Sequence, residues 1–216
     1  MEAKKKIKPM TFKEMLGRLS GAAQKSVEVK PTVSAAVLET TAKGMMKFGY
    51  EFTEDTLKIL GDYLRGYNLW LCGCVGVGKT FFFDCLSKVR QSRGMDGIVK
   101  LSMIETQGWT MDIARDWVHD MRDKDVLIDD LGTEPLMKSW GQEAELFPYL
   151  LENRMRLEER RTHLTSNLGI VDVQNRYSKR VSDRFVQYFK MEEMKAKKSR
   201  RILRPWKTSE NGAGVL

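Results

Sequence analysis

Residues 73–80 read G-C-V-G-V-G-K-T and follow the apolar run of residues 67–72, Y-N-L-W-L-C. The spacing G-x-x-x-x-G-K-[ST] after a strand-like run is typical of a loop that binds phosphate groups and leads into a helix. Glycines let the backbone turn its N–H groups toward the phosphates, and the helix N-terminus adds its dipole. The pattern therefore predicts a nucleoside triphosphate site formed by consecutive residues: Gly73, Cys74, Val75, Gly76, Val77, Gly78, Lys79, Thr80 and Phe81.

Two residues of this loop carry its chemistry. Lys79 is predicted to contact the β- and γ-phosphates as a point charge, and the Thr80 hydroxyl to bind Mg²⁺. The alternative is an ordinary glycine-rich turn. That alternative does not explain why Lys-Thr follows the glycines at this spacing after an apolar strand.

Residues 125–134, D-V-L-I-D-D-L-G-T-E, resemble a second element of such sites. An apolar strand that ends in two carboxylates is typical of a Walker B strand. Asp129 is predicted to hold Mg²⁺ directly or through water, and Asp130 to orient or deprotonate the attacking water. A solvent-exposed acidic turn is the alternative, and the phosphate loop about fifty residues upstream argues against it.

Short apolar runs alternate with longer amphipathic stretches from Tyr67 onward, which is typical of β-α units and a parallel sheet. The expected strands cover residues 68–72, 98–102, 125–129, 162–166 and 189–194, with helices over 79–92, 105–121 and 143–159. Asn167 directly follows the fourth strand. Its amide is therefore expected beside the phosphate loop, where it can contact the γ-phosphate or the attacking water. The pattern predicts a three-layer α/β P-loop NTPase with a five-stranded parallel sheet.

Before this core, the chain begins with a basic tail and then carries apolar residues at helical spacing over residues 10–24. This amphipathic helix either packs on the main domain or docks on another protein. Two further helices are expected over 33–46 and 53–64, the second with Thr53 as N-cap. We expect a short helical N-terminal extension over residues 1–49, an ATPase core over 50–207 and a disordered tail over 208–216.

Composition limits the class of protein. The 216 residues are 42% hydrophobic and 31% charged, which suits one soluble α/β domain. No apolar run has the length of a membrane span and no secretory signal opens the chain, so we expect a cytoplasmic protein without membrane contact. The three cysteines and two histidines show no zinc-ligand spacing, and Cys72, Cys74 and Cys85 are expected to be reduced, buried packing residues.

The formal net charge of +8 is concentrated at the two ends. Residues 1–30 hold eight Lys or Arg against three Glu, and residues 190–207 hold eight against two. Such clusters suit single-stranded nucleic acid or an acidic protein partner, and the alternative is a solvated tail that keeps the protein soluble.

The motifs together resemble one group of proteins. The strings G-C-V-G-V-G-K-T, L-I-D-D-L-G-T-E, L-E-N-R, T-H-L-T-S-N-L and N-R-Y-S-K-R-V-S-D-R-F are similar to those of AAA+ ATPases of the bacterial DnaC/DnaI helicase-loader and IstB group. The resemblance covers roughly residues 50–205.

This resemblance implies ATP and Mg²⁺ as cofactors, a homo-oligomer formed on ATP or DNA, and no full C-terminal lid. It also implies that Arg180 or Arg184 acts as an arginine finger on the γ-phosphate of a neighbouring subunit. Local pairing of these arginines with a carboxylate such as Asp183 is the alternative. The implied partners are a replicative helicase and single-stranded DNA, with Lys100, Trp109 and residues 195–201 as candidate contacts, although Trp109 also suits packing against the sheet.

The leading functional hypothesis is thus an ATP-hydrolysing AAA+ protein of DNA replication that loads the replicative helicase onto single-stranded DNA. An IstB-like transposition helper that acts on duplex DNA with a transposase is the alternative. A small P-loop kinase is a third hypothesis, and D-D-L-G-T-E with the paired arginines suits hydrolysis between subunits better.

Overall fold

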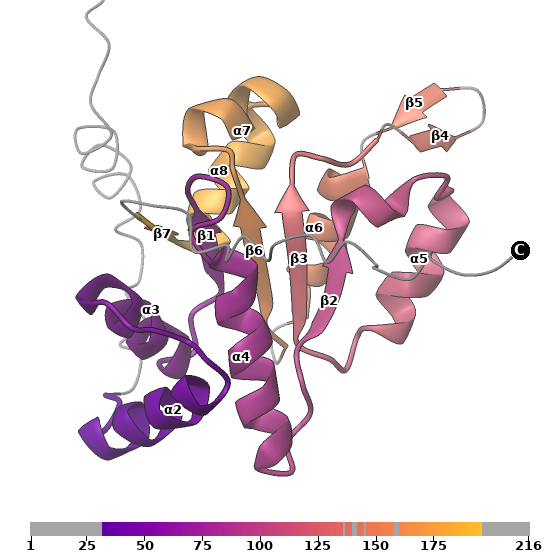
Figure 1. Cartoon of the computed structure of the whole chain (residues 1–216). Helices are drawn as coiled ribbons and strands as arrows, with labels where there is room; N and C mark the ends of the chain where they lie inside the picture. The colour runs from indigo at the N-terminus through magenta and orange to yellow at the C-terminus, as the bar shows by residue number, and fades with distance from the viewer. Residues whose placement is uncertain (1–31, 136, 140–141, 145, 158–159, 196–216) are drawn as a thin grey trace, which may run out of the picture.

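The computed structural model describes residues 32–135, 137–139, 142–144, 146–157 and 160–195. Figure 1 shows their arrangement, with helices on both sides of a central sheet. The elements in chain order are α2 Ala35–Lys47, α3 Glu54–Leu64, β1 Leu69–Cys72, α4 Lys79–Ser92, β2 Val99–Ser102, the 3-10 helix η1 Met103–Thr106, α5 Met111–Asp120, β3 Val126–Leu131, β4 Met137–Ser139, β5 Gln142–Ala144, α6 Leu146–Arg154, β6 Thr162–Ser166, α7 Ile170–Tyr177, α8 Lys179–Tyr188 and β7 Lys190–Glu193.

The main sheet has five strands in the order β2-β3-β6-β1-β7, and all of its pairs are parallel. All five expected strands are present within two residues of their expected ends. The first strand, β1, lies between β6 and β7, whose residues come much later in the chain. The phosphate loop therefore leaves the sheet next to the strand that precedes Asn167.

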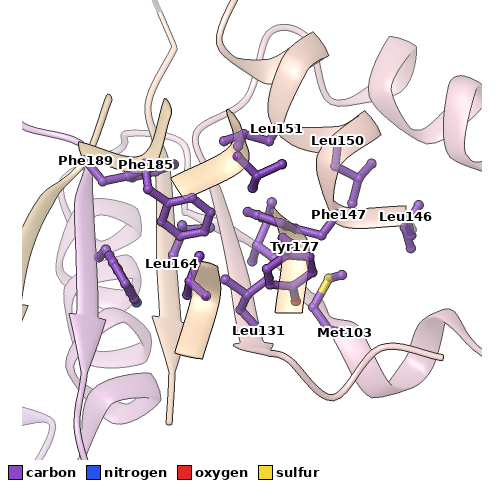
Figure 2. Close-up of a cluster of buried hydrophobic side chains, with 14 of the residues drawn as sticks. Met103, Leu131, Leu146, Phe147, Leu150, Leu151, Leu164, Tyr177, Phe185 and Phe189 are labelled. Carbon is purple, nitrogen blue, oxygen red and sulfur yellow. The ribbon is translucent and has the colours of Figure 1, made fainter. Parts of the chain in front are cut away.

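Alternate residues of the strands face two different hydrophobic layers. Trp70, Ile128 and Leu164 pack with α5, α6, α7 and α8, and Figure 2 shows part of this cluster. Leu69 and Leu127 pack instead with α2, α3 and α4. Because successive side chains of a strand point to opposite faces, runs that are apolar throughout are suited to a sheet that is covered on both sides. The expected three-layer α/β fold is confirmed.

Two expected helices are wrong in extent. The helix expected over 105–121 begins only at Met111, because Gly108 takes a left-handed backbone (φ 83°) and Thr110 caps the new helix by accepting a hydrogen bond from the Ile113 N–H. The helix expected over 143–159 spans only Leu146–Arg154, since the preceding residues form the antiparallel hairpin of β4 and β5. The sequence analysis missed this hairpin.

The two helices expected before the phosphate loop are confirmed as α2 and α3. The Thr53 side chain caps α3 as expected. Helix α2 packs on α4, and a Cβ at Gly44 would lie 3.0 Å from a methyl group of Val89. The amphipathic helix expected over 10–24 and the C-terminal tail lie outside the described residues, and the domain boundaries stay predictions.

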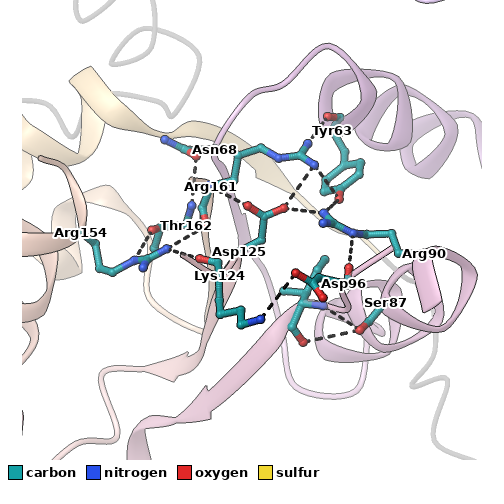
Figure 3. A network of polar contacts seen from close by, with 11 residues as sticks. Tyr63, Asn68, Ser87, Arg90, Asp96, Lys124, Asp125, Arg154, Arg161 and Thr162 are labelled. Carbon is teal, nitrogen blue, oxygen red and sulfur yellow. Dashed lines mark hydrogen bonds and ion pairs between the residues drawn. The ribbon is translucent and has the colours of Figure 1, made fainter. Parts of the chain in front are cut away.

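A polar network lies at the N-terminal edge of β3 and β6, opposite the phosphate loop (Figure 3). The Asp125 carboxylate accepts hydrogen bonds from the Arg161 N–H at 3.0 Å and from the Arg90 guanidinium at 2.5 Å. Burial opposes ionisation of Asp125, but these bonds outweigh it and hold the pKa of the carboxyl below its usual range. Arg154 is buried as well and donates to the carbonyls of Met121 and Lys124. This edge has a structural role.

Candidate nucleotide-binding site

The backbone of the phosphate loop joins β1 directly to α4. Gly73 has φ 140°, and a Cβ there would come within 2.4 Å of the Met194 carbonyl oxygen, so only glycine fits. Gly78 has φ 99° and is the N-cap of α4, whose first residue is Lys79. The loop therefore ends at a helix N-terminus, whose first N–H groups have no carbonyl partner within the helix, and this is the arrangement that binds phosphate.

Lys79 lies at the centre of the site. The residue is 5% exposed. Its ammonium donates to the carbonyls of Gly73 at 2.7 Å and Cys74 at 3.0 Å and to the Asn167 amide oxygen at 2.8 Å. Burial lowers the pKa of Lys79, and the nearby Asp130 charge acts in the opposite direction. The three acceptors are neutral, so phosphate oxygens that replace them would interact more strongly with the ammonium.

A second group of side chains links the loop to the acidic strand. The Thr80 hydroxyl donates to Asp129 Oδ1 at 2.8 Å, and the Thr165 hydroxyl donates to the same oxygen at 2.5 Å. Two oxygens of Thr80 and Asp129 thus converge beside the loop. Mg²⁺ takes few protein ligands and completes its octahedron with phosphate oxygens and water, so these residues fit the ion. Among the described residues, no cluster of three or more His, Cys, Asp or Glu forms a metal site by itself.

Asp130 has an unusual backbone conformation. Its φ of 56° is left-handed, and the pairing of β3 with β6 shifts register between Ile128 and Leu131. The Asp130 N–H donates to Thr165 Oγ1 at 2.9 Å, which connects it to the Asp129 bond of the same threonine. Left-handed non-glycine residues concentrate at functional sites, and this one directly follows Asp129, the predicted Mg²⁺ ligand.

Thr165 is a site residue that the sequence analysis missed. Its hydroxyl accepts a hydrogen bond from the Asp130 backbone N–H and donates one to the Asp129 carboxylate. It therefore fixes Asp129 and Asp130 relative to each other. Thr165 lies within the string T-H-L-T-S-N-L, which contributes to the family resemblance but indicates no separate role for this threonine. The strand T-H-L-T-S carries four polar side chains, and all four are buried, so composition alone does not distinguish Thr165 from its neighbours.

The remaining loop residues differ in exposure. Val77 is buried, whereas Cys74 and Val75 are exposed. The expectation that all three cysteines are buried is therefore wrong for Cys74, because it lies in the loop and not in the strand or helix that hold Cys72 and Cys85. Phe81 is exposed, and its ring centroid lies 5.9 Å from that of the buried Tyr50.

The structure does not bring Arg180 and Arg184 to the Lys79 site. Both lie on α8, in the layer on the opposite face of the sheet from α4. Both pair with Glu152 of α6: Arg184 forms a hydrogen-bonded ion pair, and Arg180 lies 3.5 Å away. Their carboxylate partner is therefore Glu152 and not the neighbouring Asp183. The Arg180 side chain is 76% exposed and that of Arg184 28% exposed.

The two candidate DNA contacts Trp109 and Lys100 differ in their surroundings. Trp109 packs against the core cluster, with its ring centroid 6.2 Å from that of Trp117. The packing interpretation of Trp109 is thus confirmed. Lys100 is exposed on β2 and pairs with Asp84 at 3.4 Å. Among the described residues, no helix has the length and apolar character needed to cross a bilayer.

Solved structures are similar to this chain. It aligns with AMPPCP-bound DnaA from Aquifex aeolicus at a TM-score of 0.51 and 18% identity, over 71% of this chain and 50% of that chain. The fold of this chain therefore resembles that of DnaA. A structure of the DnaC helicase loader aligns at a TM-score of 0.47 and 16% identity, over 73% of this chain and 99% of that one. No protein-family model and no curated protein sequence matches. At such identity the DnaA likeness shows the fold alone, and the chain spans about half the length of that structure.

Proposed function

We propose that this protein binds and hydrolyses ATP with Mg²⁺ as an AAA+ ATPase of DNA replication. The observation that carries the proposal is the contact of the Lys79 ammonium with the Asn167 amide and two loop carbonyls, beside the Thr80–Asp129 pair. Residues from three separate parts of the sequence meet there at the carboxyl ends of adjacent strands, which is where ligands of open α/β sheets bind.

Each side chain has a chemical role in this proposal. Lys79 binds the β- and γ-phosphates, and Asn167 contacts the γ-phosphate or the attacking water. Asp130 orients that water and accepts its proton, while Thr165 keeps Asp130 and Asp129 in place. When bound by Thr80 and Asp129, Mg²⁺ neutralises charge on the phosphates.

The arginines act in a neighbouring subunit. Because Arg180 and Arg184 lie on the face of the sheet opposite α4, they suit a γ-phosphate that another copy of the chain binds. A guanidinium stabilises charge that spreads over the phosphoryl oxygens in the transition state. Hydrolysis is then fast only in a homo-oligomer, which forms on ATP or DNA.

The more specific proposal is a replicative helicase loader that acts in the cytoplasm and delivers the helicase to single-stranded DNA. The series of motifs from the phosphate loop to R-V-S-D-R-F and the basic ends of the chain support it. The same motifs suit a transposition helper of the IstB kind, which would act on duplex DNA.

Light scattering on a sizing column tests the proposal. The protein is mixed with the host's replicative helicase, with ATP or without nucleotide, and Lys79→Ala serves as the control that should not respond to ATP. A complex that changes with ATP supports the loader. No complex in either state, combined with ATP-dependent assembly on duplex DNA and stimulation of a transposase, supports the transposition helper. Absence of ATP hydrolysis under all these conditions contradicts the ATPase itself.

A further inference from the structure

A buried acid follows the catalytic carboxylates in the same loop. Glu134 is only 6% exposed, and it lies at the end of the D-D-L-G-T-E string. Its Oε2 accepts a hydrogen bond from the Gly132 N–H at 2.8 Å, and its Oε1 accepts one from the Tyr177 hydroxyl. A carboxylate is rarely buried unless it is paired, so this side chain holds two segments together.

The segments that it joins are the loop after β3 and the C-terminal end of α7. The Arg176 guanidinium lies 3.6 Å from Glu134 Oε1 and also donates to the Glu134 carbonyl at 3.1 Å. Burial, with the Glu134 charge second, raises the pKa of Tyr177, so its hydroxyl remains a donor. Figure 2 shows the Tyr177 ring among the core side chains beside Phe147, which fixes its position.

The loop is also packed tightly against the segment after Asn167. Gly132 has φ 100°, and a Cβ there would come within 2.6 Å of a methyl group of Leu168. Asp130, Asn167 and the end of α7 are therefore parts of one packed unit. A shift of the loop at Asp130 is transmitted to Tyr177, because closely packed groups do not move independently.

A strained residue separates this unit from the helix that carries the arginines. Helix α7 ends at Tyr177 and α8 begins at Lys179, with Ser178 alone between them. Ser178 has φ 106° and ψ 162°, a conformation that is essentially restricted to glycine. Such strain persists only where the surroundings impose it, and the bonds of Glu134 to Tyr177 and Arg176 act on the adjacent turn.

We propose that Glu134 is a positioning residue that acts through Tyr177 and Arg176 to set the orientation of α8. Helix α8 carries Arg180 and Arg184, which act on the neighbouring subunit. The position of these arginines then depends on the conformation of the loop that holds Asp130 in the same chain. This inference rests on the proposed function. It assigns to each subunit a connection from its own nucleotide site to the finger that serves the next site.

Tyr177→Phe tests the connection, since it removes one hydroxyl and keeps the ring. Tyr188→Phe, on exposed α8 surface, is the matched control. We expect the Tyr177→Phe protein to keep its ATP affinity and its hydrolysis rate at low protein concentration. Its assembly-stimulated hydrolysis rate should fall about fivefold. Glu134→Gln provides a second variant, which keeps an acceptor but lacks the charge that faces Arg176.

Mixed assemblies separate coupling from a general structural effect. Most subunits of the assembly carry Arg180→Ala and Arg184→Ala, and a small fraction carry both arginines. Hydrolysis then occurs only at the nucleotide sites that contact one of the arginine-bearing subunits. Tyr177→Phe is placed in one type of subunit or the other. Loss of rate only when it lies in the arginine-bearing subunits supports the inference.

The other outcomes overturn it. The coupling is contradicted if Tyr177→Phe lowers the hydrolysis rate equally in either type of subunit. It is also contradicted if Tyr177→Phe in the arginine-bearing subunits leaves the rate unchanged. In both cases the function of the arginines is unaffected. If the arginine-bearing subunits do not restore hydrolysis at all, action of the arginines between subunits is contradicted, and the coupling is contradicted with it.

Discussion

The Lys79 site and the Arg180–Arg184 pair differ in how the structure holds their charges. Lys79 is buried and donates to three neutral oxygens that lie where phosphates are expected. The arginines are more exposed and are held by the carboxylate of Glu152. The first site is assembled within one chain. The second is a pair of cations that must leave Glu152 before they can contact a phosphate of another subunit. Four predictions test this contrast.

The largest effect is expected at the arginines. Arg180→Ala with Arg184→Ala should leave ATP binding unchanged and lower assembly-stimulated hydrolysis by about 10³-fold, because the transition-state charge loses its cation. Steady-state phosphate release at high protein concentration measures this. We expect Arg180→Ala alone to give most of the loss, since its side chain is the more exposed of the two. A stimulated rate that survives the double variant would remove the finger assignment.

Asp130→Asn is expected to act within the chain's own site. Nucleotide affinity should stay the same and hydrolysis should slow by about 10²-fold, because the amide cannot accept the proton of the attacking water. Single-turnover hydrolysis beside a fluorescent-nucleotide titration separates the two quantities. An unchanged single-turnover rate would show that another group activates the water.

Lys79→Ala tests the site in which a buried lysine donates to neutral oxygens. Loss of the ammonium should weaken ATP binding by about 30-fold, equivalent to about 2 kcal/mol. Lys88→Ala is the matched control, since Lys88 is an exposed lysine of the same helix α4. Calorimetric titration with ATP measures both variants, and equal affinities would contradict the assignment of the phosphate loop.

The smallest effect is expected at Glu152. Glu152→Gln removes the charge that holds both arginines and should raise hydrolysis at limiting protein concentration by about two- to threefold, since a partly exposed ion pair contributes at most about 1 kcal/mol. Asp183→Asn makes the same change in charge on exposed α8 surface beside Arg184 and should have no effect. A fall in rate with Glu152→Gln would mean that the pair orients the arginines for their role and does not withhold them.

The parts of this contrast that follow local patterns could be predicted from the sequence. Glycine spacing places Lys79 and Thr80 at a helix start. Strands that are buried on both faces contain apolar runs, so the runs L-W-L-C of β1 and V-L-I of β3 predict these two strands. Parallel strands present their carboxyl ends at one edge, which brought Asn167 to Lys79.

The parts that depend on long-range contacts could not be predicted. Nothing in the sequence near Arg184 indicates that its partner is Glu152, because that pair depends on how α6 packs beside α8. The same limit applies to the hydroxyl of Thr165 between two aspartates and to the hairpin of β4 and β5. Periodicity reports which residues are buried but not which residues they meet.

The position of β1 in the sheet has a consequence for synthesis of the chain. Its neighbours are β6 and β7: the Leu69 N–H donates to His163 across 94 residues, and Asp62, just before β1, accepts from Lys190 across 128 residues. A ribosome must therefore release most of the chain before β1 finds either neighbour, and folding that waits for such distant pairings is slow. The apolar run that precedes the phosphate loop stays exposed during that interval, which makes chaperone binding to the nascent chain advantageous.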